Sequence, residues 1–391
     1  MTNILVECPQ KIASVQVGVL EPLRPLEEAG TCEVHYQDTA KVTPADIAWC
    51  DVFICVRGCE YPTLHLVQAA KNAGCFLIYF LDDDLLEIPE EIHSTNYFRD
   101  NKIKMYLTRI LELCDVLWAV NKEIIYKYKK FVSRTILLRV PAKILRQPPS
   151  CTGILHVLYA GSKDHSKLVQ EILVPAVKKI LEEYPGLVDF TFIGADPNLK
   201  HIKGVRWYSY FENYEEYHKI VLSGEFSVGL APVYNTSFYS CKYYNKFIEY
   251  SSCGIAGIYS DSEPYRQIIQ TGKNGILCHN DTNSWYQAIS NLVETPQRAR
   301  EIAQQASELL KVQFNHATIG QSLQSQIPEI VSYHAPAILK ENIRLKSMKR
   351  LFYQERILFL CRTYGFFAPL IIALKAMKKV WKYIWKRKGV N

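Results

Sequence analysis

Short apolar runs alternate with amphipathic segments along the first 148 residues. The runs are nearly continuous in Val, Ile, Leu and Phe, which is typical of strands in a parallel sheet covered on both faces. They lie at residues 4–6, 34–36, 52–56, 76–81, 116–120 and 135–140. Between them, the spacing of apolar residues predicts helices over 22–29, 61–73 and 101–114. This alternation predicts an α/β domain with a Rossmann-like sheet.

The alternation stops at RQPPSCTG, residues 146–153, where paired prolines and a glycine interrupt both periods. It resumes with apolar runs at 154–161, 187–194, 205–208, 226–233, 254–260 and 274–280. Helical spacing follows these runs at 167–183, 214–222, 241–252, 265–271, 285–293 and 296–314. We therefore expect a linker and a second Rossmann-like domain. Two such domains can hold a ligand between the carboxyl ends of their strands.

Composition narrows the class of protein. Of the 391 residues, 48% are hydrophobic and 22% are charged, which argues against a disordered chain and against a multi-span membrane protein. The 12 cysteines form no CxxC pair, and several lie in apolar runs where thiols act as small hydrophobic groups. The first residues, MTNILVECPQK, do not resemble a secretory signal. These features favour a reduced, cytoplasmic setting.

The net charge of +7 is concentrated at the C-terminal end. Residues 335–391 contain fourteen Lys or Arg against two Glu, so this segment carries +12 and the remainder −5. A positive field confined to one segment argues against a nucleic-acid-binding protein. The uncharged run 363–374 is too short to span a bilayer, and the Trp, Tyr and basic residues after it suit an anionic membrane surface. The alternative is a C-terminal helix packed on the first domain.

Residues 230–285 carry the most specific pattern of polar residues. Thr236, with Ser237 and Ser240, can cap the following helix, whose N-terminus suits an anionic phosphate. Lys242, Lys246 and Glu249 stand at i, i+4 and i+7 of the predicted helix 241–252 and would share one face. A ligand-binding face and a solvated face with a Lys246–Glu249 ion pair both fit this spacing.

The motifs EYSSCG, GIAGIYSDSEPYRQII, GKNGIL and NDTNSW, together with residues 157–197, resemble the donor-binding signature of glycosyltransferase family 4. The resemblance covers about residues 50–315. It implies the GT-B fold, in which two Rossmann-like domains with parallel sheets face each other across a cleft. It also implies an N-terminal acceptor-side domain at 1–148 and a donor domain at 153–316. Helices at 317–391 would cross back to the first domain and end in a basic, aromatic, membrane-proximal tail.

By this resemblance, Glu249 would hold the ribose hydroxyls of a nucleotide-sugar, and Lys242 or Lys246 would neutralise the leaving diphosphate. Two departures concern the sugar and phosphate contacts. Ser162 replaces a frequent arginine, so the phosphate grip would be shared differently, and Cys241 replaces the first of two paired glutamates. The other expected donor-binding residues are Gly161, Ser162, Lys163, His165, Lys167, Asn235 and Thr236. For His165 a solvated turn position is an equal alternative.

The segment YFLDDDLLEIP, residues 79–89, places three aspartates after an apolar strand. Asp82 and Asp84 match the Asp-x-Asp motif with which GT-A glycosyltransferases bind a divalent metal. In a GT-B enzyme the diphosphate would lie in the other domain, stabilised without an obligatory metal. We therefore expect Asp82, Asp83, Asp84 and Arg57 to bind the acceptor, with Asp82 and Asp84 orienting its hydroxyl. Capping of a following helix and metal binding are the alternatives.

The resemblance predicts a retaining hexosyltransferase that uses a nucleotide-sugar and no metal or other cofactor. Its acceptor would be a glycan or lipid-linked glycan of a cell-surface polysaccharide, such as lipopolysaccharide or capsule. The enzyme would be cytoplasmic and peripheral on the inner face of the cell membrane. A non-catalytic GT-B scaffold and a sugar-nucleotide epimerase are the alternatives.

Overall fold

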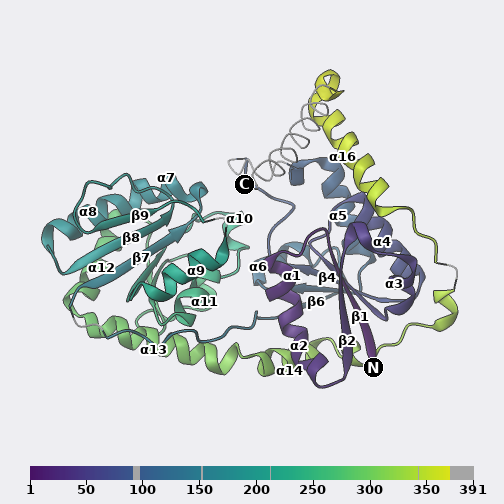
Figure 1. Ribbon diagram of the computed structural model, residues 1–391, viewed down its shortest axis with the longest axis horizontal. Helices are drawn as coiled ribbons and strands as arrows, with labels where there is room; N and C mark the ends of the chain where they lie inside the picture. Colours follow the sequence, from purple (N-terminus) through teal and green to yellow (C-terminus); the bar gives the residue numbers. More distant parts are fainter. Residues whose placement is uncertain (91–96, 151–152, 212, 342, 370–391) are drawn as a thin grey trace, which may run out of the picture.

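The computed structural model describes residues 1–90, 97–150, 153–211, 213–341 and 343–369. It contains two six-stranded sheets, each flanked by helices, with the two halves side by side (Figure 1). Every neighbouring strand pair in both sheets is parallel. The two Rossmann-like sheets predicted by the hydrophobic pattern are therefore confirmed.

The first sheet has the order β2-β1-β3-β4-β5-β6. Its central strands are almost completely buried, as a sheet covered by helices on both faces requires. The predicted run 135–140 is shorter as a strand, because only its first residues pair with β5. The strands are β1 (Thr2–Cys8), β2 (Cys32–Asp38), β3 (Val52–Val56), β4 (Phe76–Leu81), β5 (Val116–Ala119) and β6 (Arg134–Leu137).

Helices cover both faces of this sheet, and two of those that were not predicted begin with a capping residue that is visible in the sequence. One is α3, which begins with a capping box between Thr43 and Asp46, a signal present in the sequence. The other is α6, which begins with Asn121 as its cap. The full set is α1 (Ala13–Val15), η1 (Gln16–Leu20), α2 (Glu21–Glu28), η2 (Thr39–Lys41), α3 (Pro44–Trp49), α4 (Tyr61–Asn72), α5 (Asn101–Leu113) and α6 (Lys122–Tyr128).

The second sheet has the order β12-β11-β10-β7-β8-β9. Its first strand, β7, therefore lies in the middle, between β10 and β8. From β7 the sheet extends in one direction through β8 and β9 and in the other through β10, β11 and β12. Such a reversal of strand order is a topological switch point, and ligands of open α/β sheets bind outside the carboxyl ends of the strands there. The strands are β7 (Leu155–Gly161), β8 (Val188–Gly194), β9 (Val205–Tyr208), β10 (Val228–Ala231), β11 (Ala256–Ser260) and β12 (Ile276–Cys278).

The helices of the second half differ from the prediction at one functionally important place. The predicted helix 241–252 is two helices, α10 (Ser237–Ser240) and α11 (Asn245–Ser252), because Thr236 caps a separate turn that ends before Lys242. Residues 265–271 form only the short η6 (Tyr265–Gln267). The others are η4 (Lys163–His165), α7 (Ser166–Leu168), η5 (Val169–Leu173), α8 (Val174–Glu183), α9 (Tyr214–Ser223), α12 (Thr282–Glu294) and α13 (Pro296–Gln313).

After α13 the chain returns to the first half (Figure 1). There α14 packs against α2, and α16 packs against α4 and η2. Ion pairs from Arg134 to Glu329, 2.7 Å, and from Lys340 to Asp51, 2.8 Å, hold this segment. Its elements are α14 (His316–Gln326), α15 (Glu329–Ser332), η7 (Ala337–Lys340), α16 (Met348–Tyr364) and η8 (Gly365–Phe367).

The aromatic, basic end of the predicted membrane-proximal tail, from residue 370 onward, lies outside the described residues. Within the described part of the chain, no helix combines the length and the apolar character that crossing a membrane requires.

Candidate active site

A cavity of about 230 Å³ lies at the carboxyl ends of β7 and β10, at the switch point of the second sheet. Its walls come from the turn after β7, the segment after β10 and the turn between α10 and α11. The polar side chains in these walls belong to Tyr159, Ser162, His165, Tyr239, Lys242, Tyr243, Asn245, Lys246 and Tyr265. Two ammonium groups at the mouth of one helix-bounded cavity form a site for an anion.

The turn after β7 brings backbone close to this cavity. Strand β7 ends at Gly161, and Ser162 then leads in extended conformation into a continuous helical run from η4 through α8. The carbonyl of Gly161 accepts a hydrogen bond from the Ala195 amide at 3.1 Å. Gly194, next to it on β8, has φ +92°, and a Cβ there would collide with that carbonyl. Because neither glycine has a side chain, the backbones of the two strand ends approach each other closely, and the N-terminus of the following helix is directed toward the cavity.

His165 lies in the wall of the cavity rather than on a solvated turn. Its ring stands 5.6 Å from the ring of Tyr239, edge to face, and donates to the backbone carbonyl of Pro232. Burial lowers the pKa of His165 below its ordinary value, and the nearby Lys242 and Lys246 act in the same direction. The imidazole is therefore neutral at pH 7 and serves as a hydrogen-bonding group.

The hydroxyl of Tyr159 is a second polar group of the cavity wall. It is buried and has no hydrogen-bond partner among the described residues. A buried hydroxyl without a partner costs free energy that a ligand oxygen can recover by accepting its hydrogen. Tyr159 was not recognised in the sequence, because its position inside an apolar strand indicated only packing.

Lys246 and Glu249 lie on α11 and form an ion pair of 2.5 Å. The hydroxyl of Tyr217, on α9, donates to the Glu249 carboxylate and lies 3.2 Å from the ammonium of Lys246. Lys246 lines the cavity, whereas Glu249 stands behind it and is mostly buried. The Lys246–Glu249 ion pair expected as one alternative is therefore formed, and Lys246 also faces the cavity, as the alternative of a ligand-binding face requires.

Lys242 is not on the same helix face as Lys246, so the predicted three-residue stripe is wrong. It lies in the turn between α10 and α11, where its ammonium stands 4.3 Å from the centre of the Phe238 ring. The ammonium lines the cavity and also reaches Asp83 of the first half at 2.7 Å. Lys242 thus connects the cavity to the aspartates that follow β4.

The three aspartates have different surroundings. Asp82 pairs with Arg57 at 2.9 Å, and Asp83 lies 3.7 Å from the same guanidinium. Arg57 follows β3 and has φ 54°, a left-handed conformation that turns the chain at the edge of the sheet. Asp82 and Asp83 are partly exposed, unlike Asp84.

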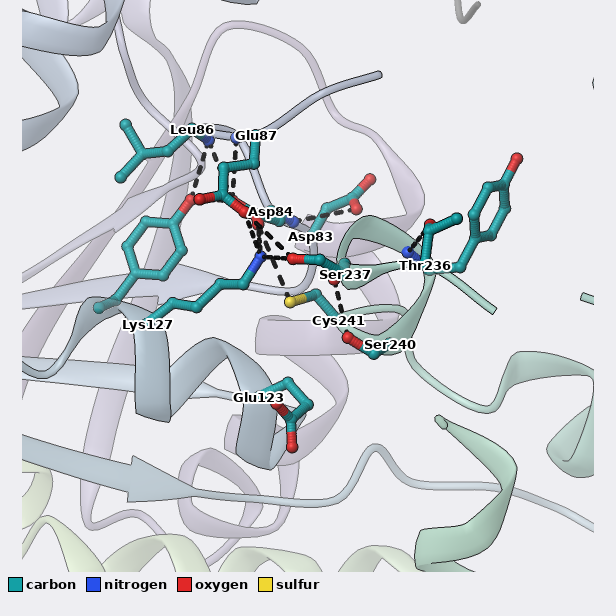
Figure 2. Close-up of polar contacts among 12 residues, drawn as sticks. Asp83, Asp84, Leu86, Glu87, Glu123, Lys127, Thr236, Ser237, Ser240 and Cys241 are labelled. Atoms are coloured by element: carbon teal, nitrogen blue, oxygen red, sulfur yellow. Dashed lines mark hydrogen bonds and ion pairs between the residues drawn. The ribbon is translucent and has the colours of Figure 1, made fainter. Parts of the chain in front are cut away.

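Asp84 is fully buried, and its carboxylate is occupied (Figure 2). Oδ2 pairs with Lys127 at 2.5 Å, while Oδ1 accepts from the Tyr128 hydroxyl at 2.8 Å and from the Leu86 amide at 3.1 Å. The Glu87 amide adds a contact of 3.3 Å. The expected acceptor and catalytic role of Asp84 does not fit this position, because both oxygens of the buried carboxylate are bonded within the protein. The alternative of capping a helix is not realised either, since no helix begins in residues 82–90; Asp84 instead accepts from the amides of the turn that follows it.

Lys127 joins the two halves and was missed in the sequence. Besides Asp84, its ammonium contacts Glu87 at 2.7 Å and the hydroxyl of Ser237 on α10 at 2.6 Å (Figure 2). Asn121, which follows β5, donates to the backbone carbonyls of Ser240 at 2.9 Å and Lys242 at 2.6 Å. These bonds fix the α10 turn, and with it Lys242, against the first half. In the sequence, the only sign of this contact between the halves was the position of Asn121 at the end of a strand.

Cys241 stands where the resemblance to glycosyltransferase family 4 would place a glutamate. Its side chain is fully buried, and Sγ lies 3.9 Å from Oδ2 of Asp84 (Figure 2). Burial raises the pKa of this thiol to about 12. The side chain points at the aspartate turn of the first half and is absent from the cavity wall.

Four other predicted donor residues lie outside the cavity wall. Lys163 is exposed, and Lys167 is 76% exposed and lies 3.9 Å from Glu171. Asn235 is exposed, and Thr236 accepts from the Tyr239 amide as the cap of α10. Gly161, Ser162, His165, Lys242 and Lys246 are the predicted residues that the fold brings together.

Known proteins share both the sequence pattern and the fold. Residues 155–295 match the family model described as glycosyl transferases group 1. No curated protein sequence matches the chain. Among the solved structures that match its fold are three that each cover 84% of this chain.

Anabaena Alr3699/HepE in complex with UDP is 13% identical, with all of its chain covered and a TM-score of 0.57. Sucrose-phosphate synthase from Thermosynechococcus elongatus is 14% identical, with 99% covered and a TM-score of 0.60. The lipopolysaccharide outer core galactosyltransferase WaaB is 14% identical, with 99% covered and a TM-score of 0.52. The chain therefore has the two-domain GT-B fold of these structures, and its residues 155–295 match the model of glycosyl transferases group 1.

Proposed function

We propose that the cavity at the ends of β7 and β10 binds the diphosphate of a nucleotide-sugar and that the sugar is transferred with retention of configuration. The observation that carries this proposal is the pair Lys242 and Lys246, which place two ammonium groups in the wall of a cavity bounded by the Gly161 turn. That UDP and UDP-glucose are bound in the HepE structures supports a nucleotide-sugar as the ligand.

The two lysines supply what the reaction needs most. When the bond between the anomeric carbon and the phosphate breaks, negative charge develops on the leaving diphosphate, and cations held in place stabilise that charge. Lys246 is held by Glu249, whereas Lys242 pairs with Asp83 and would exchange this partner for the diphosphate. Two positive side chains and a helix N-terminus can provide this stabilisation without a metal, so we propose that none is required.

On the acceptor side, Asp82, Asp83 and Arg57 lie across from the cavity. In a retaining reaction the departing phosphate oxygen can accept the proton of the acceptor hydroxyl, so the aspartates need only orient that hydroxyl. The Glu249 carboxylate would accept hydrogen bonds from the ribose hydroxyls. This role requires an opening beside Lys246, because Glu249 stands behind that residue.

The acceptor that we propose is a glycan or lipid-linked glycan of a cell-surface polysaccharide such as lipopolysaccharide or capsule. An enzyme acting on it would work in the cytoplasm, at the inner face of the membrane. The +12 charge of residues 335–391 and their aromatic residues support binding to an anionic membrane surface.

One observation favours a second function, that of a non-catalytic scaffold. The side chain of Cys241, at the position of a family glutamate, is buried against Asp84 and cannot reach a sugar in the cavity. A scaffold would retain the fold and the contacts between its halves without turning over a donor.

The test is a thermal unfolding series with UDP-, GDP- and dTDP-sugars. A ligand that binds the folded protein raises its unfolding temperature, so one nucleotide should stabilise the wild type and should stabilise Lys246→Met much less. Tyr126→Ala, an exposed substitution on α6, is the matched control and should behave as wild type. Absence of stabilisation by every nucleotide would reject the transferase and favour the scaffold.

A further inference from the structure

A second cavity lies in the first half of the molecule, under α16. It measures about 530 Å³, against about 230 Å³ for the donor cavity, and the two share no lining residue. Its walls come from η2, the start of α4, the segment before α5 and one side of α16. A cavity of this size can enclose a ligand of several hundred Å³, such as two or three sugar rings.

Aromatic rings form much of its wall. Tyr97, Phe352, Tyr353 and Phe359 all line the cavity, and the rings of Tyr97 and Phe359 meet edge to face at 4.8 Å. Tyr353 is 66% exposed, although large apolar side chains gain free energy from burial. Flat rings with a polar tip present an apolar face and a hydrogen-bonding group together. This combination matches a sugar, whose ring has apolar C–H faces and a polar edge.

Carboxylates stand among these rings. Oε2 of Glu60 is buried without a hydrogen-bond partner in the described residues, while the hydroxyl of Tyr97 donates to the same carboxylate. Glu355 is buried as well, and Arg362 contacts its Oε1 at 3.1 Å. Burial raises the pKa of Glu60. An unpaired carboxylate oxygen is costly to bury, and a ligand that donates a hydroxyl hydrogen would remove this cost.

The charges of the wall select among ligands. Glu60 and Glu355 are balanced by Lys349 and Arg356, so the cavity favours no strongly charged ligand. An acyl or polyprenyl chain would leave the Glu60 oxygen without a partner in an apolar medium, which is unfavourable. A phosphate would meet two carboxylates. A neutral ligand rich in hydroxyl groups satisfies both the rings and the carboxylates.

We propose that the cavity under α16 is a binding subsite for a neutral oligosaccharide, separate from the donor cavity. Hydroxyl groups of the glycan donate to Glu60, and its sugar rings pack on Tyr353 and Phe352. Glu60 follows Arg57 by three residues at the end of β3, so the subsite begins beside the edge that carries Arg57 and Asp82. A glycan held here binds whether or not transfer takes place in the donor cavity.

The experiment uses the full-length protein on a printed array of neutral and anionic oligosaccharides, followed by calorimetry with the best neutral glycan. We expect capture of neutral glycans. Glu60→Gln should lower the affinity at least about 10-fold, as the loss of a hydrogen bond to a charged acceptor does. Tyr353→Ala, which removes an exposed ring and leaves the fold intact, should lower it similarly. Tyr126→Ala, 70% exposed on α6, is the matched control and should bind as wild type.

Thermal stabilisation by nucleotide, measured on the same variants, separates this subsite from the donor cavity and should be unchanged in all three. Capture of no neutral glycan would overturn the proposal, as would equal affinity of wild type and Tyr353→Ala. Dodecylphosphocholine, tested below its critical micelle concentration, is the probe for an apolar chain. Its binding, lost in Tyr353→Ala while no glycan binds, would assign the cavity to a lipid and equally overturn the proposal.

Discussion

Replacing Asp84 by asparagine tests whether the aspartates after β4 form a metal site or a structural one. The substitution keeps the size of the side chain and removes its charge. In the structure this charge is fully buried and pairs with Lys127 at 2.5 Å, with three further hydrogen bonds from Tyr128, Leu86 and Glu87. An amide cannot replace all of these acceptors, and its NH₂ group would point at a donor.

The magnitude follows from the burial of this pair. Removing one partner of a buried, hydrogen-bonded ion pair lowers the free energy of unfolding by 3–5 kcal/mol in general. Lys127 keeps Glu87 as a second partner at 2.7 Å, so we expect a loss at the lower end, about 3 kcal/mol. Asp82→Asn is the matched control. Its partly exposed pair with Arg57 should contribute less than about 1 kcal/mol.

Urea denaturation followed by tryptophan fluorescence measures both losses, because Trp118 is buried on β5, next to β4 in the sheet. The reasoning would be refuted if Asp84→Asn were as stable as wild type. It would also be refuted if turnover depended strictly on Mg²⁺ or Mn²⁺ and this dependence disappeared in Asp82→Asn or Asp84→Asn.

Three further predictions concern charges at and near the site. Asp83→Asn should tighten the binding of a nucleoside diphosphate several-fold in calorimetry, because in wild type the ligand must displace the Asp83 carboxylate from Lys242. Unchanged or weaker binding would contradict this competition between Asp83 and the ligand. Burial raises the pKa of Glu7 to about 7, so this group should lower stability as the pH rises from about 4.5 to about 7. Glu7→Gln should flatten the dependence of the free energy of unfolding on pH in this range, as measured by chemical denaturation. An unchanged dependence would contradict the role of Glu7. Cys241→Glu, which restores the family residue, should lower the unfolding temperature, because the new carboxylate would be buried beside Asp84; a more stable and more active variant would show that the position still serves the sugar.

The sequence predicted the fold through features that act locally. Continuous apolar runs indicated strands buried on both faces, and β3 and β4 have this burial. The helix predicted over 241–252 was wrong because apolar spacing does not reveal where one helix ends and another begins. The cap at Thr236 starts a separate turn there, and it separates Lys242 from the face that carries Lys246.

The candidate site was predictable where one short segment builds it. The turn from Gly161 to His165 and the lysines near α11 were both recognised and both line the cavity. The contacts between the halves were not predictable. Lys127 meets Ser237 across 110 positions and Asn121 meets the carbonyl of Ser240 across 119, so no local pattern records either contact. The role of Asp84 depends on these distant partners, which is why its motif alone suggested a metal or an acceptor.

The central claim is that Lys246 and Lys242 hold a diphosphate in the cavity beside Gly161. It is tested most directly by calorimetric titration of wild type and Lys246→Met with the nucleoside diphosphate that best stabilises the protein, and with the corresponding nucleoside. We predict that the diphosphate binds wild type much more tightly than the nucleoside does. We also predict that Lys246→Met loses at least about 10-fold in affinity for the diphosphate alone, as expected for a charged hydrogen bond. Equal affinity of the two proteins for the diphosphate would contradict the claim.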